Sequence, residues 1–182
     1  MPVLLLFFFL FFLIVFSIIL LLFLGIVMMF VTRVPYAPTP HQAIQKIIDE
    51  LNIQPGQVVY DLGCGDGRFL FAAEKKGARA IGFEISPFPY LRARLKKAVT
   101  GSRAKIHYKN FYAAHLFDAN VVFCFLVDTV MPRLEKKLQA ELQPGTRVVS
   151  YGFHFPNWKM HKVILPEPEK DNFPSEIFIY QN

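Results

Sequence analysis

The N-terminal part of the chain shows an almost unbroken run of apolar positions. Within residues 3–31 only Ser17 and Gly25 interrupt this run, and no Lys, Arg, Asp or Glu occurs before Arg33. An α-helix of about 20 apolar residues already spans the hydrocarbon layer of a bilayer. The pattern therefore predicts one transmembrane helix in residues 1–32.

A cleavable signal peptide is the alternative interpretation of an apolar N-terminal run. Such a peptide has a basic start, an apolar stretch of about 7–15 residues and a small-residue cleavage site. Here the chain begins Met1-Pro2, and Thr32-Arg33 follows the run. Because these features are missing, we favour a retained membrane helix.

Beyond this run, short apolar stretches alternate with segments whose apolar residues recur every three or four positions. The Pro-rich residues 33–40 predict an extended connector, and a helix with one apolar face follows, with Thr39 as its cap. Strand-like runs occupy 58–62, 79–84, 105–108, 121–127 and 147–153, and helical patterns occupy 69–76, 88–99 and 130–142. This alternation predicts an α/β domain with a mostly parallel, twisted sheet flanked by helices.

The C-terminal pattern differs, because no helical segment separates its last two strand-like runs. Residues 159–165 and 176–181 are joined by the Pro- and acid-rich stretch 166–174. Strands without a helical crossover pair antiparallel. The sequence thus predicts a C-terminal antiparallel hairpin at the sheet edge, within one domain of residues 41–182.

Charge and composition restrict the location and the chemistry. The chain is 53% apolar and 19% charged, with a formal net charge of +6. Every Lys and Arg follows the apolar run, so the positive-inside tendency predicts the domain on the cytoplasmic side, or on the mitochondrial matrix side. Cys64, Cys124 and the five histidines lack metal-ligand spacing, and we therefore predict no metal.

A turn with three alternating glycines carries the main chemical signal. Residues 58–68 read VVYDLGCGDGR, which is typical of a strand, a tight turn and a helix. A phosphate-binding P-loop needs Gly-Lys-Ser/Thr, and the dinucleotide motif needs a glycine where Arg68 stands. Asp61 beside the turn would repel a pyrophosphate but suits a ligand that carries an ammonium group.

This segment resembles the first motif of the class I S-adenosylmethionine-dependent methyltransferases, an acid, one residue and then G-x-G-x-G. The resemblance implies a Rossmann-like fold and S-adenosyl-L-methionine as the cofactor. It also implies that Glu84 accepts the ribose hydroxyls and that Asn110, where the family usually has Asp, contacts the adenine. The implied cofactor-binding residues are Asp61, Gly63, Cys64, Gly65, Asp66, Gly67, Glu84, Asn110 and Phe111.

A second resemblance covers most of residues 34–160. The chain is similar to the membrane-attached protein-lysine N-methyltransferases that act on the ADP/ATP carrier and the ATP synthase c-subunit, and to their prokaryotic relatives. The motifs that carry this resemblance are at 35–40, 61–68, 82–85, 134–138 and 153–158. It implies that a lysine of a membrane protein accepts the methyl group.

The acceptor side has weaker signals. The Asn/Asp-Pro-Pro-Tyr/Phe signature of many amino-group methyltransferases is replaced here by LVDTV, residues 126–130. Asp128 is thus the candidate catalytic residue, and helix capping is its equally weighted alternative. Asp66 has two compatible roles, one facing the cofactor and one at a helix N-terminus. Four aromatic residues are candidates for a cation–π channel or for core packing, namely Phe111, Tyr112, His154 and Trp158.

Alternative functions remain open at this level. The acceptor could be a lipid-soluble small molecule such as an aminophospholipid or a quinone precursor, or the domain could bind the cofactor without catalysis. Basic residues at 75–79 and 92–97 are candidates for contact with anionic lipid. A nucleic-acid substrate is the weaker interpretation, because a tether restricts access to it. The predicted partners are the bilayer and a membrane-protein substrate.

Overall fold

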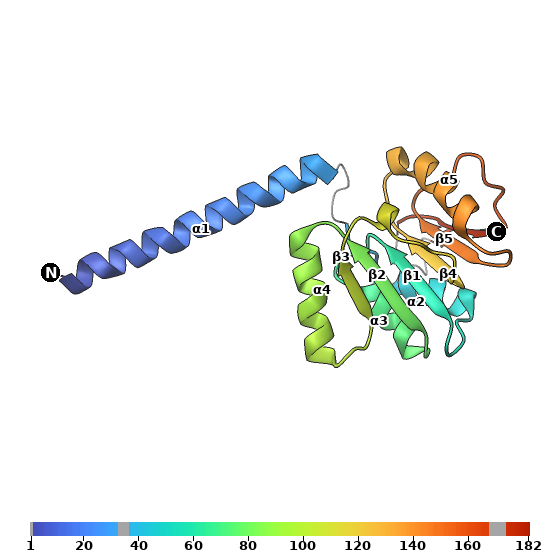
Figure 1. The fold of residues 1–182 in the computed structure, drawn as a ribbon, viewed down its shortest axis with the longest axis horizontal. Coiled ribbons are helices and arrows are strands. Elements are labelled where there is room, and N and C mark those ends of the chain that lie inside the picture. The colour runs from blue at the N-terminus through green and yellow to red at the C-terminus, as the bar shows by residue number, and fades with distance from the viewer. Residues whose placement is uncertain (1, 33–36, 168–173) are drawn as a thin grey trace. The chain divides into compact units, whose positions relative to one another are not determined.

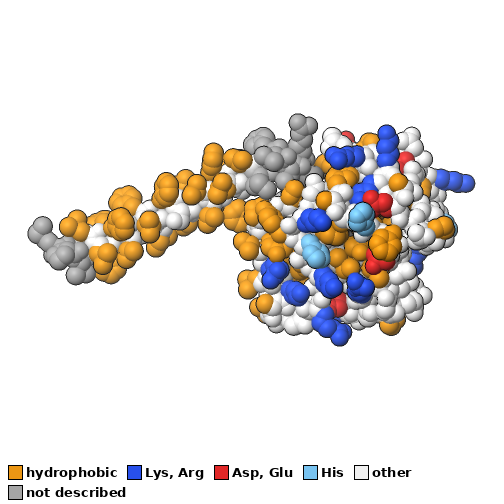
Figure 2. Space-filling model, in the orientation of Figure 1, with side chains coloured by type: hydrophobic (Ala, Val, Ile, Leu, Met, Phe, Trp, Pro, Cys, Tyr) orange, Lys and Arg blue, Asp and Glu red, His pale blue; other side chains and the backbone are white. Residues whose placement is uncertain are grey.

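The computed structural model describes residues 2–32, 37–167 and 174–182, which form two compact units, Met1–Pro35 and Tyr36–Asn182 (Figure 1). The first unit contains the single helix α1 (Pro2–Thr32). Its stretch Leu4–Val27 is long and apolar enough to cross a membrane. Large apolar side chains are exposed along α1 from Leu4 to Val27, and Figure 2 shows them on the face in view.

The predicted connector is only partly described. Residues 33–36 lie outside the described residues, and residues 37–40 have no regular secondary structure. Helix α2 (His41–Leu51) then begins without a side-chain cap, and Pro40 precedes it. The prediction that Thr39 caps this helix is therefore wrong. Instead, the backbone carbonyl of Thr39 accepts a hydrogen bond from Arg68 Nη1 at 2.9 Å.

The second unit is built on a seven-stranded sheet in the order β3-β2-β1-β4-β5-β7-β6. Its strands are β1 (Val58–Leu62), β2 (Arg79–Glu84), β3 (Lys105–Tyr108), β4 (Val121–Cys124), β5 (Arg147–Tyr151), β6 (Lys162–Ile164) and β7 (Ile177–Gln181). The first five are parallel, whereas β7 pairs antiparallel with both β5 and β6. The predicted mostly parallel sheet with a C-terminal hairpin is confirmed.

Several strands are shorter than their apolar runs. The run 121–127 continues past the end of β4, and 147–153 continues past β5. Beyond the end of β4, Leu126 is buried and Phe125 packs against the core. Of the predicted hairpin loop 166–174, residues 168–173 lie outside the described residues.

Helices cover both faces of the sheet (Figure 1). The helices are α2, α3 (Arg68–Lys75), α4 (Pro87–Thr100) and α5 (Met131–Glu141), with short 3-10 turns η1 (Phe111–Ala113) and η2 (Asp128–Val130). The apolar face of α2 packs with α3 over β1, β4 and β5, where the rings of Phe69 and Phe123 stack at 4.1 Å. Leu70 of α3 and Ala93 of α4 continue this layer over β2 and β3. Alternate strand residues face the other side, where α5 lies.

Candidate functional site

The strand order reverses between β1 and β4, which lie side by side at the centre of the sheet. In open α/β sheets, ligands bind beyond the carboxyl ends of the strands at such a switch point. The glycine turn between β1 and α3 lies there. The fold therefore places this turn where a ligand is expected.

The glycine turn depends on backbone conformations that favour glycine. Gly67 has φ +79°, and an added Cβ would lie 2.8 Å from Phe71 Cζ. The turn is also tied to the end of β2, because the N–H groups of Gly63 and Cys64 both donate to the Phe83 carbonyl at 2.9 Å. The turn thus has a fixed backbone from which side chains are largely absent.

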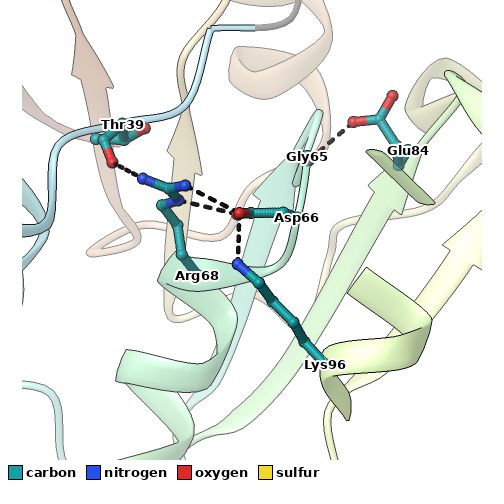
Figure 3. Close-up of polar contacts among 6 residues, drawn as sticks. All are labelled: Thr39, Gly65, Asp66, Arg68, Glu84 and Lys96. Atoms are coloured by element: carbon teal, nitrogen blue, oxygen red, sulfur yellow. Dashed lines mark hydrogen bonds and ion pairs between the residues drawn. The ribbon is translucent and has the colours of Figure 1, made fainter. Parts of the chain in front are cut away.

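Glu84 ends β2 and is almost fully buried. Its Oε2 accepts the N–H of Gly65 at 2.8 Å (Figure 3), and its Oε1 accepts those of Ile85 at 2.9 Å and Ser86 at 2.7 Å. Three backbone donors therefore hold this carboxylate in one orientation. An ionised carboxylate has about four acceptor sites, so it can still accept hydrogen bonds from a ligand.

Asp61, near the end of β1, is only 2% exposed. Burial raises the pKa of its carboxyl well above the usual value, and the nearby charges of Glu84 and Asp66 raise it further. No hydrogen bond to this carboxylate is found within the part of the chain that the structure describes. A cationic ligand group would supply the positively charged partner that the Asp61 carboxylate lacks among the described residues.

Asp66, in contrast, is neutralised within the protein. Its carboxylate accepts two hydrogen bonds from Arg68, both at 2.9 Å, and pairs with Lys96 Nζ at 2.6 Å (Figure 3). Burial alone would raise the pKa of Asp66, but the bonds from Arg68 and Lys96 outweigh it and hold the pKa well below the usual range. The side chain of Asp66 therefore fastens the turn to α3 and α4, and its backbone is what remains for a ligand.

Cys64, inside the same turn, is buried. Burial raises the pKa of its thiol well above the usual value, and the charges of Asp61 and Glu84 add to this effect. Burial and like charge thus both disfavour the thiolate form that a nucleophilic cysteine needs.

Asn110 and Phe111 follow β3 and lie next to the end of β2, because the Lys109 N–H donates to the Glu84 carbonyl at 3.1 Å. Asn110 is exposed, and its Oδ1 accepts the Tyr112 N–H at 3.0 Å. Phe111 is half-buried, and its ring contacts that of Tyr112 at 4.5 Å. The structure thus brings both residues to the same sheet edge as Glu84.

Asp128 follows β4, the other strand beside β1, and is exposed. It does not cap α5, which begins at Met131 without a side-chain cap. Its Oδ1 accepts the adjacent Thr129 N–H at 2.7 Å. Its second oxygen accepts no hydrogen bond from the described residues, so the carboxylate remains accessible from solvent.

The four aromatic candidates fall into different clusters. Trp158 packs at 5.5 Å against both Phe155 and Tyr180, which is core packing behind the hairpin. The guanidinium of Arg133 lies 4.2 Å from the ring centre of Tyr112, so a protein cation already occupies that face. His154 is exposed, and its ring centre lies 5.9 Å from that of Phe178 in β7. Phe111 is thus the candidate that remains beside the site.

Sequence reasoning missed the residues that support the turn. Lys96 comes from α4, thirty residues away along the chain from Asp66, and the Thr39 carbonyl binds Arg68 across a similar separation. Gly82, inside β2, is also required, since an added Cβ would lie 2.4 Å from Leu70 Cδ1. A glycine inside a strand is a sequence signal for such a close approach.

Known proteins are similar to this chain in sequence and in fold. The family model described as the ANTKMT methyltransferase domain matches residues 61–162. The chain is 37% identical over 158 residues to a protein-lysine N-methyltransferase of Saccharolobus islandicus, covering 84% of this chain and 96% of that protein. It is 38% identical to the adenine nucleotide translocase lysine N-methyltransferase of Mus musculus, covering 72% of this chain and 58% of that protein.

A further relative is the ATP synthase c-subunit lysine N-methyltransferase of Xenopus laevis, 36% identical over 69% of this chain and 56% of that protein. The chain thus spans little more than half the length of these two vertebrate relatives. Among solved structures, an RNA methyltransferase from Salinibacter ruber with S-adenosyl-L-homocysteine has TM-score 0.72 and 28% identity, covering 80% of this chain and 93% of that one. Magnesium protoporphyrin IX methyltransferase from Synechocystis, solved with bound S-adenosylmethionine, has TM-score 0.62 and 15% identity, covering 78% and 79%, and so shows the fold alone.

Proposed function

The chain belongs to the ANTKMT methyltransferase domain family and is an S-adenosylmethionine-dependent methyltransferase, and from this premise we propose that it methylates a lysine side chain of a membrane protein. The lysine is supported by the names of relatives that are 36–38% identical. The membrane location is supported by the long apolar helix α1.

The observation that carries the cofactor site is the pair of buried carboxylates beside a glycine turn. Asp61 has no protein donor within the described residues and suits the ammonium group of the cofactor. Glu84 is held by three backbone N–H groups and suits the two ribose hydroxyls. We assign the backbone of the turn at Gly63, Cys64, Gly65, Asp66 and Gly67 to the cofactor, and we assign Asn110 and Phe111, which follow β3, to its adenine.

The bound cofactor supplies an electrophilic methyl group, so the protein contributes mainly position. Asp61 and Glu84 lie at the ends of neighbouring strands and orient the ligand from two points. A lysine amine must lose its proton before it can attack. We assign this acceptor side to the accessible carboxylate of Asp128, which can orient the amine or accept its proton, directly or through water.

The domain organisation belongs to the same proposal. Residues 1–32 form the anchor, residues 33–40 the connector and residues 41–182 the methyltransferase domain. Because every Lys and Arg follows the anchor, the domain lies on the cytoplasmic side, or on the matrix side of a mitochondrion.

Labelled methyl groups identify the acceptor. Membranes that contain the full chain are incubated with methyl-labelled S-adenosylmethionine, and protein, lipid and RNA are then separated. We expect label in a membrane protein, with mass shifts of one or more methyl groups on a lysine. Label in the lipid extract would instead assign a lipid-soluble acceptor. Label in RNA would assign the activity for which the Salinibacter relative is named.

Calorimetry with S-adenosyl-L-homocysteine tests the binding residues. Asp61→Asn removes the charge opposite the ligand ammonium, and we expect affinity to fall about ten- to a hundredfold, the value of a hydrogen bond to a charged group. The matched control is Asp49→Asn, whose side chain is 68% exposed on α2. Equal affinities of the two variants would contradict the role assigned to Asp61.

A further inference from the structure

Helix α4 has a row of large apolar side chains on its outward face. Phe88, Leu91, Leu95 and Val99 are 41%, 60%, 66% and 79% exposed. Their spacing of three or four residues places them on one side of the helix. Ala93, fully buried against the sheet, lies on the opposite side. We call these four residues the apolar stripe of α4.

Basic residues lie beside the apolar stripe. Arg92 and Arg94 are exposed at helix positions on either side of it, and Lys96 and Lys97 follow, whereas α4 contains no acidic residue. Figure 2 shows hydrophobic and basic side chains side by side where α4 lies. Exposed apolar patches with a polar rim mark contacts with a protein or a membrane.

We propose that the apolar stripe of α4 rests in the headgroup region of an anionic bilayer, so that the domain contacts the membrane directly. A basic helix with an apolar face lies in the plane of such an interface. Lipid fits better than a protein groove, because the stripe runs from Phe88 to Val99 along α4, and the charged side chains of this helix are all basic. A bilayer is close at hand if α1 spans it as proposed, because the connector of residues 33–40 extends at most roughly 28 Å.

This contact would act on the candidate site through α4. The helix begins at Pro87, three residues after Glu84, whose carboxylate accepts the N–H groups of the intervening Ile85 and Ser86. Further along, Lys96 pairs with Asp66 of the glycine turn. A docked α4 therefore fixes the cofactor site near the bilayer and favours acceptor lysines close to that surface. The contact itself rests on the proposed anchor and not on methyl transfer.

A fluorescent probe on α4 measures the contact in the full chain. Leu95→Cys is labelled with an environment-sensitive fluorophore, and the protein is placed in lipid nanodiscs with nitroxide-labelled acyl chains. The native Cys64 and Cys124 are buried, so the new thiol is labelled selectively. Gln139→Cys, exposed on α5, is the matched control. We expect nitroxide quenching at residue 95 and little at residue 139.

Changes in the charge of the lipid and of α4 test whether electrostatic attraction contributes to the membrane contact. Phosphatidylglycerol in the disc should increase quenching at residue 95, and Arg92→Gln should lower the docked-to-undocked ratio about fivefold, the effect of one charge near an anionic surface. Lys136→Gln on α5 should leave it unchanged. Equal quenching at residues 95 and 139 would overturn the proposal. Shielding of residue 95 only when a second membrane protein is present would also overturn it, and would assign the stripe to a protein partner. Neither result depends on methyl transfer.

Discussion

At the scale of single residues, three carboxyl groups close together behave differently. Glu84 is fixed by backbone donors, and Asp66 is neutralised by Arg68 and Lys96. Asp61 has neither kind of partner among the described residues and is surrounded by the other two. Burial and like charge therefore concentrate an unfavourable charge at one position. A cationic ligand relieves that cost, which is why Asp61 suits binding more than stability.

The raised pKa of Asp61 gives a pH dependence of stability in the unliganded protein. The folded-state pKa of Asp61 lies above the ordinary 3.8. At pH values between these two pKa values, the folded state holds a proton that the unfolded state has lost. Stability contributed by this group therefore falls as the pH rises from about 4 through the folded-state pKa. Asp61→Asn should thus be more stable than the parent at neutral pH, and this gain should shrink on acidification. Urea unfolding at several pH values checks this, and a gain independent of pH would contradict it.

Asp66 has the opposite sign, because its carboxylate is paired when folded. Its stabilising contribution is present above the ordinary pKa and is lost as the pH falls towards the lower folded-state pKa. Asp66→Asn removes the negative charge that Arg68 and Lys96 share, and should cost about 1–3 kcal/mol at neutral pH. Asp49→Asn, at an exposed pair with Lys76, should change stability by less than about 0.5 kcal/mol. Unfolding in mild detergent, followed by Trp158 fluorescence, measures both losses of stability. Equal losses would contradict the stabilising role of the contacts that Asp66 makes with Arg68 and Lys96.

At the scale of elements, the turn between β1 and α3 joins conformational and steric demands. Gly67 and Gly145 both have positive φ, +79° and +87°. A Cβ at Gly67 would meet Phe71, whereas one at Gly145 would meet nothing within 4 Å. A substitution at Gly145 therefore causes backbone strain alone, whereas one at Gly67 causes strain and a steric clash.

Replacing each glycine by alanine tests this distinction. Gly145→Ala should cost about 1–2 kcal/mol, the strain of a left-handed residue. Gly67→Ala should cost more and should also weaken binding of S-adenosyl-L-homocysteine, because Phe71 must move beside the turn. Denaturant unfolding and calorimetry measure the two effects. Similar stability losses and unchanged affinity would show that the turn tolerates a Cβ.

Helix α4 shows that a periodic pattern does not say which face is buried. Apolar residues at helical spacing usually face the core. In α4 the small residues Pro89 and Ala93 face the sheet, and the larger Leu91 and Leu95 face outward. The buried positions of α4 are therefore small residues, and its exposed face carries the larger apolar ones. This exposed face is the one that we propose contacts lipid.

At the scale of the whole molecule, the anchor proposed for α1 has a direct test. The full chain should remain in the membrane fraction after alkaline carbonate extraction. Two arginines at the helix centre, Leu13→Arg with Leu20→Arg, each cost about 2.5–3.5 kcal/mol in insertion and should release the chain. Ser17→Ala is the control, since the Ser17 hydroxyl donates to the Leu13 carbonyl of the same helix and the change adds no charge. Retention of the arginine variant would contradict a membrane span.

The sequence by itself determined the apolar helix, the alternating elements, the edge hairpin and the order of Asp61, the glycine turn and Glu84. These are local features, because hydrophobic period and glycine conformation act over a few residues. Only the tertiary structure decided which acid is neutralised, where the strands end and which face of α4 is exposed. Lys96 reaches Asp66, and Arg68 reaches Thr39, across about thirty residues each. Such contacts depend on how elements pack, and packing depends on side-chain shape across the whole core.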